Sequence, residues 1–382
     1  MSFQVGGTDY TSSTITIDEA IEKVTDQRRQ RQDIQIPLKA FSLGLDANGE
    51  NVTGTIDGID YVPTLHCLKQ MATWMGVSHA VLKQYMNPVL NQNGSIRYKR
   101  DQTDRELLVA LFKNGIRDGR VDPEKEFKFR TYTDGTLRAM LSDRYAIIDN
   151  VWYLNEIKSI MGDEPRFTHW RGDADTLYGN LLVPDTIRQE SDSEYGGMLS
   201  VSNCEIGKRR LSLTPSIFRS LCTNGLIFGQ EMGERLSQVH RGSVDLMKLR
   251  ERMDDNINET LPLISAGIDQ FLEMQKMPLT AQPTEIIAQI AQDYKLSSGQ
   301  NGQAVEVVRQ FGKHESGNRN LFGIVNAITR AAQEYDPAEH VRLDEIGGGM
   351  MEYDPSKWVA YNNRAKGMSE KQRNKIFGRV AA

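Results

Sequence analysis

Basic residues gather in two places in this 382-residue chain, and both placements suit the binding of a polyanion. Residues 357–382 hold seven Lys or Arg against one acidic residue, a net charge of +6, whereas the whole chain carries −5. Trp358, Tyr361 and Phe377 are interleaved with these charges. Cations that neutralise phosphates, next to rings that stack on bases, are what sequence-independent binding of a single strand requires.

This C-terminal segment also has a simpler interpretation. It could be a solubilising tail, or one that docks on the acidic body of a neighbouring subunit. If it binds nucleic acid, the candidate contacts are Arg364, Lys366, Lys371, Arg373 and Lys375.

A second basic run, Lys208-Arg209-Arg210, falls at a predicted turn between two strands. Alternation along a strand places residues of one parity on one face, so Arg138 and Arg144 could flank the same groove. Structural salt bridges to the many acidic residues are the competing interpretation. The candidate nucleic-acid contacts of this central region are Arg138, Arg144, Tyr145, Arg166, Arg171, Lys208, Arg209, Arg210 and Arg219.

Motifs for catalysis or cofactor binding are missing from the sequence. It contains no phosphate-binding Gly-x-x-x-x-Gly-Lys-Ser/Thr, no Gly-x-Gly-x-x-Gly and no His-Glu-x-x-His, and its six histidines are scattered. Segment 46–57 loosely resembles a calcium loop, but Asn51 stands where that loop needs glycine, so a hairpin is favoured. Acid pairs such as Asp173/Asp175 and Asp254/Asp255 leave a metal-dependent nuclease as the least favoured option. We expect no cofactor, no metal site and no catalytic residue.

The cysteines and the apolar pattern indicate where the protein works. Cys67, Cys204 and Cys222 are odd in number and widely spaced, which predicts buried, reduced thiols. There is no apolar N-terminal stretch and no run of 18 apolar residues, so we expect neither a signal peptide nor a membrane partner. These features favour a cytoplasmic location.

Periodicity predicts helices and hairpins in the first part of the chain. Residues 1–15 are polar and look disordered, and Thr16 and Glu19 have the spacing of a capping box that opens a polar helix or arm. The following elements are a hairpin at 38–57, two short helices within 64–86, a helix at 102–117, a hairpin at 127–141 and a helix at 150–161.

The remaining sequence predicts a sheet followed by helices. Strands are expected near 165–171, 176–183, 197–205 and 209–213, and Thr214-Pro215 then opens a helix that runs to about Phe228. From 240 to 335 the pattern is helical with an interruption at Pro262, and Gly347-Gly348-Gly349 predicts a flexible break.

The fold class is therefore α+β, with a central, mostly antiparallel sheet and a packed helix (a β-β-β-α core), a helical N-terminal part and a C-terminal helical region. We expect four parts: a flexible arm or surface helix at 1–35, the α+β core at 36–235, a helical region at 236–350 and a basic tail at 351–382.

Four segments, in order along the chain, resemble a family of phage- and plasmid-borne proteins catalogued as a domain of unknown function. They are Tyr61–Met71, Leu137–Asn150, Arg219–Leu226 and Asn320–Thr329. The resemblance implies a protein of mobile elements in a bacterial cytoplasm and supplies no established activity.

The predicted order of strands and helix at 176–228 is similar to the core of single-strand annealing proteins, the superfamily of phage Red-beta, RecT and Erf. That similarity implies ATP-independent binding and annealing of single-stranded DNA in recombination, by a ring or helical homo-oligomer. It also implies a phage exonuclease or a host single-strand-binding protein as a further partner. The alternative is a phage or plasmid interaction protein, either a counter-defence factor or a structural component, that binds no DNA.

Overall fold

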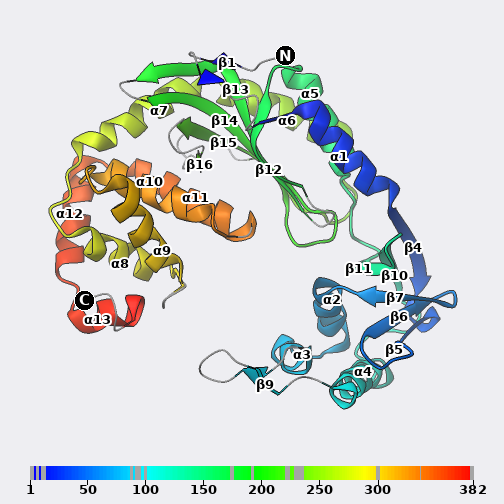
Figure 1. Cartoon of the computed structure of the whole chain (residues 1–382). Helices are drawn as coiled ribbons and strands as arrows, with labels where there is room; N and C mark the ends of the chain where they lie inside the picture. Colours follow the sequence, from blue (N-terminus) through cyan, green and yellow to red (C-terminus); the bar gives the residue numbers. More distant parts are fainter. Residues whose placement is uncertain are drawn as a thin grey trace.

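The computed structural model describes residues 4–5, 8–9, 14–86, 89–90, 96–98, 101–172, 176–190, 193–219, 224–227, 236–297, 302–335 and 337–378. These residues form two main sheets and a group of C-terminal helices. Figure 1 shows the second sheet at the top, with the first sheet and the C-terminal helices below it on opposite sides. The α+β class with mostly antiparallel sheets is confirmed.

The first sheet has six strands in the order β4-β10-β11-β7-β6-β5. Neighbouring strands are antiparallel except for β7 and β11, which are parallel. The strands are β4 (Arg31–Pro37), β5 (Phe41–Leu45), β6 (Val52–Ile56), β7 (Ile59–Pro63), β10 (Glu126–Tyr132) and β11 (Thr136–Ser142). Both predicted hairpins, β5-β6 and β10-β11, are confirmed.

Three helices pack on the first sheet: α2 (Leu65–Met75), α3 (His79–Met86) and α4 (Gln102–Arg117). Met71 and Phe112 bury their side chains against Phe127 and Phe129 of β10. Gly76 ends α2 with a φ of 72°, the left-handed conformation that glycine adopts without strain. The predicted division of 64–86 into two helices at this glycine is confirmed.

The second sheet has seven strands, in the order β16-β15-β14-β13-β12-β3, with β17 also pairing with β15. They are β3 (Ile15–Thr16), β12 (Arg166–Gly172), β13 (Leu177–Glu190), β14 (Ser193–Asn203), β15 (Leu211–Arg219), β16 (Asn224–Ile227) and β17 (Leu236–Gln238). Small separate pairs are β1 (Gln4–Val5) with β2 (Thr8–Asp9), and β8 (Val89–Leu90) with β9 (Ile96–Tyr98).

One face of the second sheet is covered by α1 (Ile17–Arg29), α5 (Asn150–Met161) and α6 (Leu246–Thr260). Ile17, Leu154 and Met253 of these helices pack against Leu181 and Leu199 of the sheet. The capping box predicted for Thr16 and Glu19 opens α1. Residues 15–35 therefore belong to the folded body rather than to a flexible arm. β3 is a strand of the second sheet, α1 packs on that sheet, and β4 is a strand of the first sheet.

The helix predicted from Thr214 to about Phe228 is wrong. Residues 214–219 lie in β15, and 224–227 form β16. Apolar Leu213 and Ile217 alternate with Thr214 and Ser216, which is the period of a strand, and both sets are buried. The β-β-β-α arrangement consequently fails at this position, and Phe228 itself lies outside the described residues.

The C-terminal helices share one core. They are α7 (Leu263–Glu273), α8 (Pro283–Asp293), α9 (Gln303–Gln310), α10 (Leu321–Ala332), α11 (Pro337–Gly349), α12 (Pro355–Lys366) and α13 (Glu370–Phe377). Pro262 separates α6 from α7 as predicted. The break predicted at Gly347–Gly349 is wrong, because these glycines end α11 and Gly347 and Gly348 are buried.

Helices α12 and α13 also correct the interpretation of the basic tail. Trp358 is only 1% exposed, and its Nε1 donates a hydrogen bond to the carbonyl of Pro278 at 2.9 Å. Tyr361 and Phe377 are buried in the same core. The rings that suggested base stacking are core residues, and the segment is not a free arm.

Two further predictions concern thiols and membranes. Cys67 and Cys204 are buried and free, as predicted, whereas Cys222 lies outside the described residues. None of the helices in the described part of the chain is both long enough and apolar enough to cross a membrane.

Candidate nucleic-acid interface

A cleft of about 740 Å³ lies where the first sheet meets the second, and we call it the basic cleft. One wall comes from α2, the residue before β10, and the end of β11 with the turn after it. The other comes from the loop between β14 and β15 and from the segment after β17. The lining residues are Gln70, Thr73, Trp74, Lys125, Met140, Leu141, Ser142, Asp143, Arg144, Tyr145, Gly207, Lys208, Arg209, Arg210, Val239, His240 and Arg241.

Positive charge dominates the basic cleft. Among the residues that the structure describes, six cationic side chains and one carboxylate line it: Lys125, Arg144, Lys208, Arg209, Arg210, Arg241 and Asp143. The carboxylate lies 4.0 Å from Nζ of Lys125. Arg144, Arg210 and Arg241 are exposed, and no residue in the described ranges forms an ion pair with them. The lining therefore has a surplus of cations available to an anionic ligand.

Hydrogen bonds from the first-sheet wall fix the loop that carries Lys208–Arg210. The Tyr145 hydroxyl donates to the Cys204 carbonyl at 2.8 Å and accepts from the Gly207 amide at 3.1 Å. The Gln70 side chain donates to the Ile206 carbonyl at 2.8 Å. Gly207 has a φ of 81°, which a residue with a side chain rarely adopts. The loop is thus held in place before any ligand arrives.

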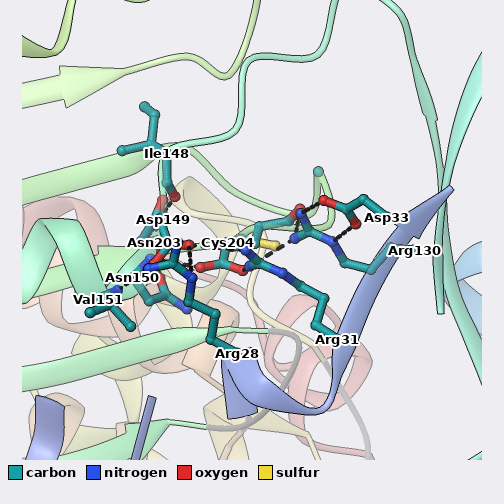
Figure 2. Close-up of polar contacts among 12 residues, drawn as sticks. Arg28, Arg31, Asp33, Arg130, Ile148, Asp149, Asn150, Val151, Asn203 and Cys204 are labelled. Carbon is teal, nitrogen blue, oxygen red and sulfur yellow. Dashed lines mark hydrogen bonds and ion pairs between the residues drawn. The ribbon is translucent and has the colours of Figure 1, made fainter. Parts of the chain in front are cut away.

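A buried ion network lies behind this loop (Figure 2). Arg130 of β10 has a fully buried side chain, whose Nε and Nη2 donate to the two carboxylate oxygens of Asp33, both at 2.8 Å. Its Nη1 donates to the Glu205 carbonyl at 2.7 Å. Although burial alone would raise the pKa of Asp33, the hydrogen bonds and charge of Arg130 outweigh it and hold that pKa below its usual value.

The network extends to the start of α5. Arg31 forms ion pairs with Glu205 and with Asp149, the latter at 3.0 Å, and Arg28 lies 3.3 Å from the same Asp149 carboxylate. The other Glu205 carboxylate oxygen accepts from the Asn150 amide at 2.6 Å. These contacts tie β4, α5 and the basic loop together, so the two walls of the cleft are joined at its back.

Aromatic side chains form part of the cleft lining. The rings of Tyr145 and His240 stack with centroids 5.2 Å apart and planes within 3°. Nδ1 of His240 lies 3.0 Å from the Ala146 carbonyl, which can only accept, so Nδ1 carries the proton. Burial lowers the pKa of His240, which favours the neutral ring. Trp74 is half-buried, with Lys125 Nζ 5.0 Å from the ring centroid.

Five of the predicted site residues meet in the basic cleft: Arg144, Tyr145, Lys208, Arg209 and Arg210. Arg138 is outside it, because its guanidinium pairs with Asp134 at 3.0 Å and lies over the Tyr132 ring at 4.3 Å. The expectation that Arg138 and Arg144 flank one groove is therefore wrong.

The other predicted contacts of the central region lie elsewhere. Arg166 begins β12 beside Thr16 and is not among the described residues that line the cleft. Arg171 and Arg219 lie in β12 and β15, but their side chains are outside what the structure describes.

The predicted contacts of the C-terminal segment divide into two groups. Arg364 pairs with Asp293 and Arg373 with Glu285, each at 2.6 Å, so the guanidinium groups of these two residues form ion pairs within the C-terminal helices. Lys366, Lys371 and Lys375 are exposed on α12 and α13, apart from the basic cleft.

The lining residues that the sequence analysis missed include two cations and one large aromatic residue: Lys125, Arg241 and Trp74. Each is isolated in its segment, and none belongs to a basic run. Arg241 is placed by the neighbouring Gly242 amide, which donates to the Arg144 carbonyl at 2.9 Å. Contacts between segments about 100 residues apart leave no local signal in a sequence.

The calcium-like segment is a hairpin turn, as predicted. The Asp46 carboxylate accepts hydrogen bonds from the Glu50 amide at 2.8 Å and from the Asn51 side chain at 2.7 Å, so its oxygens stabilise the turn. Among the residues that the structure describes, no group of three or more His, Cys, Asp or Glu side chains could hold a metal ion.

Comparison with known proteins adds no relative: no protein-family model, curated protein or solved structure matches this chain.

Proposed function

We propose that this protein binds single-stranded DNA in the basic cleft and promotes the annealing of complementary strands without ATP. The observation that carries the proposal is that six cations and one carboxylate are found among the described residues of a cleft that also exposes apolar and aromatic surface. Phosphates bind such cations in any sequence, because the interaction depends on charge and on the release of counterions.

The uncharged part of the lining favours a single strand over a duplex. Trp74 and Val239 line the cleft beside the cations, and Val239 is 45% exposed. Unpaired bases have free faces that stack on such surfaces, each stack contributing about 1–3 kcal/mol, whereas the bases of a duplex are already stacked on each other.

Annealing of complementary strands requires bound strands whose bases stay accessible. The similarity to single-strand annealing proteins depended on a helix at 214–228, and the described part of that segment is strand. What supports annealing now is the cleft, since contacts to phosphates leave base edges available for pairing. Assembly of several copies along one strand would multiply weak contacts by avidity. A phage exonuclease or a host single-strand-binding protein remains a proposed further partner.

Fluorescence anisotropy tests the proposal. We expect a labelled single strand of ~40 nucleotides to bind at ~50 mM salt and to dissociate steeply as salt rises. Changing Lys208, Arg209 and Arg210 together to Ala should abolish binding and, with it, annealing of complementary strands. Lys366, Lys371 and Lys375 changed to Ala remove the same charge outside the cleft and serve as the control. No binding at ~50 mM salt would refute the function.

A second candidate is an interaction protein, and exposed apolar side chains near β7 favour it. Ile59, Val62 and Leu65 are 56%, 42% and 43% exposed within seven residues of sequence. Such surface is a common feature of protein contacts. If this role is the correct one, the wild-type protein should retain a host partner in a pull-down and bind no DNA, and changing all three residues to Ser should release the partner.

A further inference from the structure

The charge in the basic cleft is concentrated beyond what the interior of a DNA strand needs. An internal nucleotide carries one phosphate charge, and domains that bind single strands contact about 4–16 nucleotides along an extended path. A cleft of about 740 Å³ is instead in the range of sites that enclose one small ligand, roughly 300–1,000 Å³. The six cations among its described lining residues, gathered around a space of this size, therefore suit a ligand with a high charge density.

The cations also approach this space from both walls. Lys125 and Arg144 lie on the first-sheet wall, whereas Lys208–Arg210 and Arg241 lie on the second-sheet wall. Arginine presents a planar fork of N–H donors that matches the oxygens of a phosphate group. A terminal phosphate monoester has three such oxygens and about −1.5 to −2 charges at neutral pH, so several arginines can contact it together.

The protein segments that carry these cations are held in fixed positions, which also suits a compact anion. The loop of Lys208–Arg210 is held by Tyr145 and Gln70, and the turn that carries Arg144 is bonded to the segment of Arg241. Charges that are already held together bind a compact anion without a large cost in ordering the protein. The half-buried Trp74 ring, on the same wall as Lys125, can take the base next to the phosphate.

We propose that the basic cleft receives the phosphorylated end of a DNA strand, with the cations on the terminal phosphate and the aromatic lining on the end nucleotide. This inference rests on the proposed function, because it presumes that DNA is the ligand. It goes further by naming the strand end, rather than the strand interior, as the part that is recognised.

Four versions of one oligonucleotide of ~20 nucleotides test the inference in anisotropy competition: 5′-phosphorylated, 3′-phosphorylated, unphosphorylated, and closed into a circle. We expect one of the phosphorylated linear strands to compete at least about tenfold better than the circle, an energy difference of about 1.4 kcal/mol. The first two strands show which end is recognised.

Variants locate the effect. Arg144→Gln, Arg210→Gln and Arg241→Gln in one protein should remove the preference for the phosphorylated end. Lys366→Gln, Lys371→Gln and Lys375→Gln remove three charges elsewhere and should leave it intact. Because all six side chains are exposed, we expect both proteins to fold, and their melting temperatures check this.

The outcomes separate the two proposals. Equal competition by the circle and by both phosphorylated strands would overturn recognition of the end and leave single-strand binding in place. Failure of every oligonucleotide to bind would overturn both. A preference for an end that survives in the cleft variant would place the site elsewhere on the protein.

Discussion

Nη1 of Arg130 donates to the backbone carbonyl of Glu205 at 2.7 Å, and this buried contact joins the first sheet to the basic loop of the second. Nε and Nη2 of the same guanidinium donate hydrogen bonds to the two carboxylate oxygens of Asp33. Glu205 is three residues before Lys208. The loop that carries Lys208–Arg210 is thus positioned by a charged side chain of the first sheet.

Replacing Arg130 by Met should destabilise the protein strongly. The change leaves the Asp33 carboxylate without its arginine partner and removes one of the two arginines that pair with Glu205, and removal of one member of a buried ion pair typically costs about 3–5 kcal/mol. Urea unfolding at neutral pH measures this loss. Lys39→Met is the matched control, since Lys39 pairs with Glu124 at 2.8 Å but the two side chains are 56% and 66% exposed. Its cost should stay below about 1 kcal/mol, and equal losses in the two variants would contradict the role given to Arg130.

The Tyr145 hydroxyl offers a test of how firmly the basic loop is held. Tyr145→Phe keeps the stacked ring but removes both loop contacts, so we expect about 1–3 kcal/mol of destabilisation and faster amide hydrogen exchange at 205–210. Tyr153→Phe is the control, because the Tyr153 hydroxyl donates to the buried Ser212 carbonyl at the same 2.8 Å, away from the cleft. It should lower stability without changing exchange at 205–210. Unchanged exchange in Tyr145→Phe would show that other contacts hold the loop.

Local patterns predicted many of the individual elements. Helices α4 and α5 lie where periodicity placed them, and each is opened by an aspartate, Asp101 and Asp149, whose side chain accepts from an amide of the first turn. The error at 214–219 has a local cause as well. Thr214-Pro215 resembles a helix start, but the apolar and polar residues around it alternate as in a strand, and residues 212–219 pair with β14.

The cleft was less predictable because it joins distant segments. Arg144, Tyr145 and Lys208–Arg210 stood out as compact groups in the sequence, whereas Arg241 and Trp74 did not. The ion pair of Arg130 and Asp33 spans 97 positions, so charge counting along the chain could not find it. Charge counting also gave the wrong interpretation of the C-terminal segment. Its many charges suggested a free tail, although one side of α12 and α13 is buried in the C-terminal core.

The charges of this segment can be tested without deleting it. Deletion of 357–382 would remove Trp358 and Phe377 from the C-terminal core and destabilise the protein. Substitution of Lys366, Lys371 and Lys375 by Gln leaves Trp358 and Phe377 in the core and tests the charges alone. We expect a modest loss of affinity in anisotropy, smaller than that of the Lys208–Arg210 variant. If the three exchanges abolished binding, the site would lie on α12 and α13.

A buried carboxyl group on α11 predicts a pH dependence of stability. Asp344 is fully buried, His340 Nε2 lies 3.1 Å from its carboxylate, and the ring of Tyr178 in β13 contacts His340. Burial raises the pKa of Asp344 to about 6, above its usual 3.8. The folded state then holds a proton that the unfolded state has released, so stability from this group is present below about pH 4 and is lost as pH rises through about 6.

Asp344→Asn isolates this effect, since the amide does not ionise. The free energy of unfolding of the wild type, minus that of the variant, should decrease between ~pH 4.5 and ~pH 7 and be constant above that range. Urea unfolding of both proteins at several pH values gives the difference, which reports the coupled Asp344–His340 pair because titrating groups away from this pair largely cancel. Asp293→Asn is a control at a partly exposed carboxylate that pairs with Arg364. A difference that rises with pH would mean that the charge of the ionised Asp344 is stabilised by His340 more than it is penalised by burial.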